Sequence, residues 1–177
     1  MVALLVVVLA LGFALASFTG ILPTGGSTPN ANLSSPRNFP PIAGIGCDET
    51  VEDVSSARAM LVIRVNGQRQ TIPGGIGKRT GCRYGAYTSD STGVIHIDVA
   101  AGQSFTLGQF FNIWLEPLDE TRIGQYVGSG GEVVFAFVDR EPWEGDPRAI
   151  PLAVQTIIEL QLGTERQEPL DIQLPSE

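Results

Sequence analysis

Apolar residues flank the pair Asn66-Gly67 on both sides along the chain. Met60 to Val65 precedes the pair, with Leu61, Ile63 and Val65 spaced to share one face, and Gln68 to Ile72 follows it. An Asn-Gly pair between apolar runs favours a type I′ turn, which needs positive φ at both positions. The pattern therefore predicts a β-hairpin from strands 60–65 and 68–72, ended by Pro73.

Three further segments have the spacing of strands. Val94 to Val99 follows a Gly-containing turn, and Glu132 to Val138 follows the loop 128–131. Thr156 to Leu162 alternates apolar and polar positions near the end of the chain. The segment from Asp139 to Arg148 is rich in polar residues, and we predict a long polar turn there.

A short helix is predicted after Thr106. Thr106 and Gln109 have the spacing of a capping box, in which the two side chains satisfy the free N–H groups at a helix start. Leu107, Phe110, Phe111 and Trp114 recur at helical spacing, which is typical of a helix face buried in the core. Pro117 keeps the helix short.

The order of these elements is hairpin, strand, helix, strand, strand, which is typical of an α+β domain. We expect a small mixed sheet with one short helix, in a β-grasp-like arrangement, and a small β-sandwich is the alternative. The domain is predicted over residues 47–165. A linker rich in Pro, Gly and Ser over 23–46 precedes the domain, and a charged tail over 166–177 follows it.

The N-terminal segment is the strongest signal of location. Residues 2–22 are predominantly apolar and carry no charged side chain. A run of about 20 apolar residues can span a bilayer as a helix. Residues 1–22 are therefore predicted to be a transmembrane anchor or, alternatively, a signal peptide cleaved after Ala14-Leu15-Ala16. Either alternative places the domain on the extracytoplasmic side, membrane-anchored or secreted.

Composition agrees with an exported protein that does not bind nucleic acid. The formal net charge is −8, and the small basic group of Arg69, Lys78, Arg79 and Arg83 is interpreted as a solvated face. The two cysteines, Cys47 and Cys82, are expected to form a disulfide in an oxidising compartment. Closing that loop stabilises the fold by on the order of 3–4 kcal/mol. Two buried free thiols are the alternative.

Candidate chemistry centres on the only histidine. His96 and Asp98 alternate with Ile95 and Ile97, so both point to the polar face of their strand. A hydrolase with His96 as base and Ser89, Ser91 or Thr92 as nucleophile lacks any signature of an oxyanion hole. A metal site of His96, Asp98 and Asp90 is the other possibility, although one histidine is a weak ligand set. We expect no enzyme activity and no cofactor apart from this possible metal ion.

Four stretches together resemble a family of small exported proteins from archaea and bacteria. They are LVIRVNGQRQTIPGGIG, CRYGAYTSDSTGVIHID, FTLGQFFNIW and GDPRAIPL, and the resemblance covers most of residues 47–163. The family pattern has a His-rich segment before the Asn-Gly hairpin. It then has His-Thr-His-Asp leading into Thr-Gly-x-Ile-His-x-Glu, and a helix with Leu-Gly-x-Phe-Phe-x-x-Trp. Its histidines suggest a metal such as copper.

This chain departs from the family at most of the histidines. It has Ser56, Arg58 and Met60 in the first cluster, Tyr87-Thr88-Ser89-Asp90 in the second, and Asp98 in place of Glu. The resemblance therefore implies a kept scaffold with a lost metal function. We expect a membrane-tethered extracytoplasmic binding or structural module, for example an accessory subunit of a membrane complex with protein partners. The alternative is a metal-binding exported protein with a degenerate site.

Overall fold

The computed structural model describes residues 39–48, 54–100 and 103–175. The predicted anchor at 1–22 and the first part of the predicted linker lie outside these ranges. None of the helices within the described ranges is long and apolar enough to cross a membrane.

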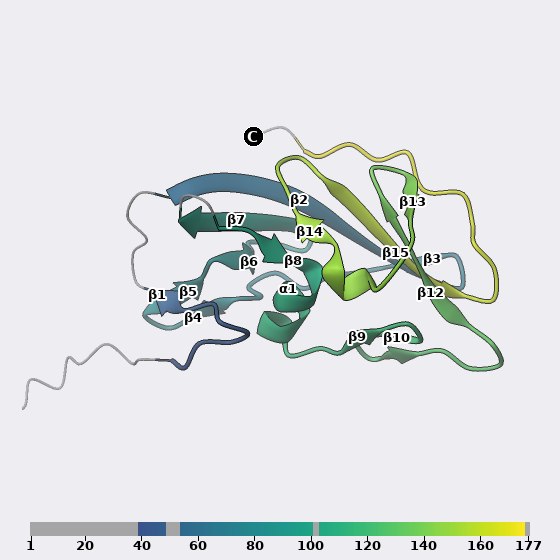
Figure 1. The fold of residues 1–177 in the computed structure, drawn as a ribbon, viewed down its shortest axis with the longest axis horizontal. Coiled ribbons are helices and arrows are strands. Elements are labelled where there is room, and N and C mark those ends of the chain that lie inside the picture. The colour runs from purple at the N-terminus through teal and green to yellow at the C-terminus, as the bar shows by residue number, and fades with distance from the viewer. Residues whose placement is uncertain (1–38, 49–53, 101–102, 176–177) are drawn as a thin grey trace, which may run out of the picture. The chain divides into compact units, whose positions relative to one another are not determined.

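The domain is built on a seven-stranded mixed sheet (Figure 1). Its strand order is β13-β12-β15-β2-β7-β6, and β3 pairs with β2 in addition. The strands are β2 (Val54–Val65), β3 (Gln68–Gln70), β6 (Ala86–Thr88), β7 (Val94–Ala100), β12 (Val133–Val138), β13 (Glu141–Trp143) and β15 (Ile157–Gly163). Only the central pair, β2 and β15, runs parallel. The expected class, an α+β domain with a mixed sheet and one short helix, is confirmed.

The hairpin around Asn66-Gly67 forms as predicted. Both residues have positive φ, 49° and 81°, as a type I′ turn requires. Two bounds differ from the expectation: β2 begins at Val54, and β3 ends at Gln70. The additional length of β2 pairs with β7, with Ser56 opposite Asp98. Long-range pairing with β7 therefore extends the strand beyond its apolar run.

Helix α1 (Leu107–Trp114) begins with the predicted capping box. The Thr106 N–H donates to Gln109 Oε1 at 2.9 Å, and the Gln109 N–H donates to Thr106 Oγ1 at 3.3 Å. The helix ends at Leu115, which has a left-handed φ of 66°. The buried face of α1 belongs to the same apolar core as one face of the sheet, which we call the inner face.

Short strands and one turn of 3-10 helix complete the fold. One small sheet joins β1 (Cys47–Asp48), β5 (Cys82–Tyr84) and β4 (Lys78–Arg79), and another joins β9 (Leu118–Asp119), β10 (Arg122–Ile123) and β11 (Tyr126–Val127). β8 (Phe105–Thr106) pairs with β14 (Pro151–Leu152), and η1 spans Pro147–Ala149. Cys47 and Cys82 form the expected disulfide, which ties β1 to β5.

The structure corrects the sequence prediction for residues 139–148. Glu141–Trp143 form β13, which pairs with the end of β12, so this segment is not only a polar turn. The end of the expected linker also belongs to the domain: Ile45 is buried, and the Tyr84 hydroxyl donates to the Pro40 carbonyl at 3.2 Å. Residues 166–175 lie along the sheet and are held there by hydrogen bonds.

The sheet has two unlike faces because side chains alternate along each strand. The inner face is apolar and packs on α1. The opposite face, which we call the outer face, mixes polar and apolar side chains; in β2, β7 and β15 it carries Ser56, Arg58, Met60, Val62, Arg64, His96, Asp98, Glu159 and Gln161. Both candidate sites described below lie on this outer face.

Candidate functional site

Arg58, His96 and Tyr87 form one row across the outer face, because strand register places them opposite one another. His96 in β7 is the cross-strand partner of Arg58 in β2 and of Tyr87 in β6. Side chains that face each other on antiparallel neighbours have Cβ atoms about 4.5–5.5 Å apart. The imidazole and phenol rings are stacked, with centroids 5.0 Å apart and an angle of 14° between their planes.

Asp98 occupies the next row and is held on both carboxylate oxygens. Ser56, its cross-strand partner, donates from Oγ to Asp98 Oδ1 at 2.9 Å. Arg83 of β5 donates from Nη2 to Asp98 Oδ2 at 2.6 Å. The guanidinium of Arg83 also lies over the Tyr87 ring, 4.3 Å from its centroid. Asp98 is thus fixed by two partners and is not poised beside the imidazole as an orienting group.

A hollow of about 380 Å³ opens above these rows. It is lined by Ser56, Ala57, Arg58, Tyr87, His96, Asp98, Val154 and Gln155. The segment before β15 forms one wall and is fixed to β2, because the Gln155 N–H donates to the Arg58 carbonyl at 2.7 Å. We call Ser56, Arg58, Tyr87, His96 and Asp98 the open half of the outer face.

Burial and neighbouring charges shift the pKa of both rings in the open half. The pKa of His96 lies below its ordinary value of 6.5, chiefly because partial burial disfavours the imidazolium and also because Lys78 is nearby. Arg58 acts in the same direction, while Asp98 opposes it. Burial raises the pKa of Tyr87, and Asp98 raises it further. At neutral pH both rings are therefore uncharged and lie among cationic side chains.

Asp90, the third residue of the predicted metal site, is committed to its own turn. Its Oδ1 accepts hydrogen bonds from the N–H and the hydroxyl of Thr92, and these bonds lower the pKa of the Asp90 carboxyl. Within residues 39–48, 54–100 and 103–175, no group of three or more His, Cys, Asp and Glu side chains could hold a metal ion. The structure brings His96 and Asp98 together, but it does not add Asp90 to them as a ligand set.

The hydroxyl groups considered as nucleophiles are not aimed at His96. Ser89 Oγ accepts from Lys78 Nζ at 3.2 Å, and the Thr92 hydroxyl donates to Asp90. In the described part of the chain, no hydrogen bond joins the imidazole to Ser89, Ser91 or Thr92. The nucleophile–base contact that a hydrolase of this type requires is therefore not formed.

The sequence prediction missed several residues that build the open half. Arg83 and Lys78 were assigned to a solvated face, whereas Arg83 holds Asp98 and both cations lie over the Tyr87 ring. Positions 56, 58 and 87, where the resemblance leads us to expect histidine, line the hollow together with His96. No feature of the sequence predicts that Gln155 lines the hollow, because only the tertiary fold brings its segment to β2.

Comparisons with family models, with curated proteins and with solved structures find no match to this chain.

Proposed function

We propose that this chain is a membrane-tethered extracytoplasmic binding module, and that the open half of its outer face is the binding site. The observation that carries the proposal is that Asp98 is held by Arg83 and Ser56 while the His96 ring is stacked on Tyr87. Side chains fixed in this way present a rigid surface to a ligand. Proton transfer would instead need a base in contact with a reacting group.

Two features of the chain support the proposed location. The disulfide between Cys47 and Cys82 is typical of an oxidising compartment outside the cytoplasm. The apolar run at residues 2–22 has the length and composition of a membrane anchor. A tether at the N-terminus leaves the domain free to meet partners at the membrane surface, as an accessory subunit of a membrane complex does.

The finer description of the fold that we propose is a β-grasp arrangement. β2 and β7 form a first antiparallel pair, α1 follows, and β12 and β15 form a second pair. The first and last of these strands, β2 and β15, are parallel neighbours at the centre of the sheet. The helix packs on the inner face, and the open half of the outer face remains available for binding.

The residues that line the hollow offer a partner subunit both charged and aromatic contacts. Arg58, His96 and Tyr87 lie in one row there, and the negative charge of Asp98 is matched by Arg83.

Native mass spectrometry of the detergent-extracted protein tests this proposal. We expect the uncleaved chain to be extracted with a partner subunit, and the pair to be lost in the double variant Arg58→Gln/His96→Gln. Arg79→Gln is the matched control, because Arg79 is an exposed cation that does not line the hollow. A wild-type protein that is cleaved at its N-terminus and strictly monomeric would contradict both parts of the proposal.

A second candidate function is metal binding by a site that has since degenerated. It is favoured by the row Arg58–His96–Tyr87, because three adjacent cross-strand positions are close enough for three histidines to share one metal ion. We expect Arg58→His/Tyr87→His to bind Cu²⁺ in a calorimetric titration, with the wild type as reference. A folded double variant that binds no more Cu²⁺ than the wild type would rule out this candidate.

A further inference from the structure

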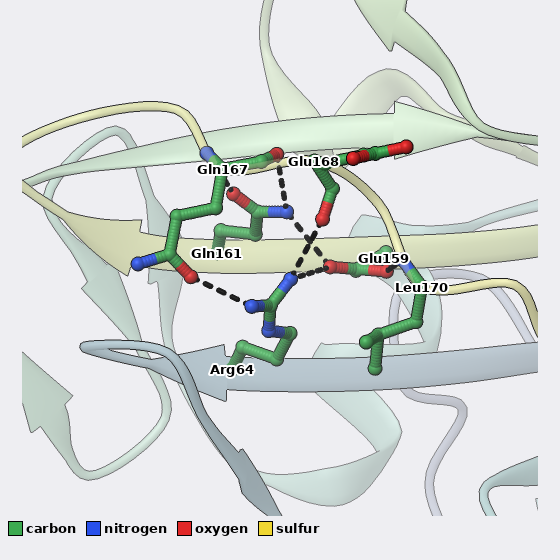
Figure 2. Close-up of polar contacts among 6 residues, drawn as sticks. All are labelled: Arg64, Glu159, Gln161, Gln167, Glu168 and Leu170. Carbon is green, nitrogen blue, oxygen red and sulfur yellow. Dashed lines mark hydrogen bonds and ion pairs between the residues drawn. The ribbon is translucent and has the colours of Figure 1, made fainter.

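The C-terminal segment 166–175 lies on the outer face without forming a strand of the sheet. Its main chain is bound by side chains of β15. The Gln161 amide brackets one residue of the segment: it accepts from the Gln167 N–H at 2.9 Å and donates to the Gln167 carbonyl at 3.1 Å (Figure 2). A side-chain amide that bonds both the N–H and the C=O of one residue recognises extended peptide backbone and does not depend on the residue's side chain.

Further contacts along the segment also reach main-chain atoms. Glu159 Oε2 accepts from the Leu170 N–H at 2.8 Å, and Arg64 Nη1 donates to the Glu168 carbonyl at 3.0 Å (Figure 2). At the far end, Arg58 Nη1 donates to the Pro175 carbonyl at 3.2 Å. We call Arg64, Glu159 and Gln161 the covered half of the outer face.

Burial shows that the covered half is built for an occupant. Glu159 and Gln161 are each only 4% exposed, although both lie on the outer face of the sheet. Glu159 is also paired with Arg64 at 2.9 Å. A buried carboxylate and a buried amide are tolerated only when their hydrogen-bonding atoms have partners. Much of that partnership comes from the main chain of the segment, so without an extended peptide here these groups would lose bonds.

The side chains of the segment alternate between partly buried and exposed positions. Leu170, Ile172 and Leu174 are partly buried, whereas Asp171 and Gln173 between them are exposed. An extended chain with this alternation presents one apolar edge to the sheet and one polar edge to solvent. The exposed residues Thr164 and Glu165 form the bend that connects the segment to β15.

We propose that the covered half is a peptide-binding surface that also accepts the C-terminal segment of a second copy of this chain. Exchange of the segment between two copies keeps every contact described above and changes only the bend at 164–165, which makes it a low-cost route to a dimer. The inference rests on the proposed function in one respect. Copies tethered to the same membrane meet at a high effective concentration, and this favours exchange.

A labelled peptide of residues 165–177 tests the surface directly. The acceptor is the full chain carrying Gln167→Pro/Leu170→Pro, because proline removes the two N–H groups that Gln161 and Glu159 bind. We expect the wild-type peptide to bind this acceptor with 1:1 stoichiometry in fluorescence anisotropy. A peptide with both prolines should bind about tenfold more weakly or worse, because two hydrogen bonds are lost. A peptide with Glu168→Ala is the matched control and should bind as the wild type does.

Equal binding of the wild-type and proline peptides to a folded acceptor would overturn the proposal, and so would no binding of either. If the acceptor does not fold, the wild-type full chain is refolded from urea at high concentration and examined by native mass spectrometry. We expect dimers that are absent after refolding of the Gln167→Pro/Leu170→Pro chain, and monomers alone would overturn the proposal. Every variant in these experiments keeps Arg58, His96 and the N-terminal segment unchanged, and neither readout needs a partner subunit or a membrane, so failure of this inference can be told apart from failure of the proposed function.

Discussion

The covered and open halves of the outer face satisfy their polar side chains in opposite ways. In the covered half, Glu159 and Gln161 bond the main chain of a segment that lies over them. In the open half, Asp98 accepts hydrogen bonds from Ser56 and from the neighbouring Arg83, and a hollow lies above them. One half of the sheet face therefore has a peptide segment bound to it, and the other half is accessible. The difference arises because main-chain atoms complete the hydrogen bonds in the first half, whereas side chains complete them in the second.

The largest expected effect comes from removing a charge in the covered half. We expect Glu159→Ala to lower the free energy of unfolding by about 3–5 kcal/mol, because it leaves Arg64, whose side chain is only 12% exposed, without its ionic partner. Urea denaturation measures this change. Glu168→Ala is the matched control: its side chain is 89% exposed and its carbonyl still accepts from Arg64, so the expected change is below about 0.5 kcal/mol. Equal effects of the two substitutions would show that the covered half is not built around this carboxylate.

The second largest effect is expected from removal of the disulfide, which lies next to the open half. We expect Cys47→Ser/Cys82→Ser to lower the free energy of unfolding by about 3–4 kcal/mol, because the unfolded chain regains the freedom of the closed loop. Cys82 also adjoins Arg83, which holds Asp98. Hydrogen exchange should therefore increase most in residues 82–88, while residues 157–170 stay protected. Uniform loss of protection across both segments would show that the disulfide does not act locally on the open half.

A smaller loss is expected from Asp98→Ala. The substitution removes the acceptor of Ser56 and Arg83, and we expect a cost of about 1–2 kcal/mol, since Arg83 is 44% exposed and can turn to water. Asp171→Ala in the C-terminal segment provides the comparison. Its side chain is 85% exposed, so its change in chemical denaturation should stay within about 0.5 kcal/mol. A change for Asp98→Ala as small as that for Asp171→Ala would contradict the conclusion that the bonds from Ser56 and Arg83 to Asp98 stabilise the open half.

The smallest effect is the pH dependence that arises from His96. Because the folded state lowers the pKa of His96 below 6.5, the unfolded chain binds the proton more tightly than the folded chain does. The contribution of His96 to stability is therefore full above pH 6.5 and is lost as the pH falls below 6.5 through the folded pKa. Since the chain has one histidine, an NMR titration of its ring gives the folded pKa without ambiguity.

His96→Gln tests the same point through stability. Unfolding free energies measured from pH 7.5 downward should fall less steeply for this variant than for the wild type. In the Asp98→Ala protein, by contrast, the pKa of His96 should fall further, because the carboxylate that supports the imidazolium is gone. A His96 pKa at or above 6.5 in the folded wild type would contradict this account of the open half.

Several elements could be predicted from short stretches of sequence. The turn at Asn66-Gly67, the capping box of Thr106 and Gln109, and the disulfide were expected and are confirmed. Each of the first two depends on residues that are neighbours in the chain, and the third depends on there being only two cysteines. The prediction was wrong for Glu141–Trp143, which form an edge strand because β12 is available to pair with them.

The candidate sites could be predicted only in part. The alternation of His96 and Asp98 correctly places both on one face, but it does not show that Arg83 holds the carboxylate. The tail was expected to be no more than a charged extension, because its sequence contains Pro and charged residues. Its role on the sheet is visible only when Gln161 and Glu159 are seen to bond its backbone.

By itself, the sequence determined the local features of this protein: the hairpin turn, the helix start, the apolar faces of the strands and the pairing of two cysteines. These depend on φ preferences, capping and burial, which act over a few neighbouring residues. The tertiary structure alone decided that Arg58, His96 and Tyr87 form one row and that residues 166–175 cover Glu159 and Gln161. Strand register and long-range contacts set these features, and no short stretch of sequence encodes either of them.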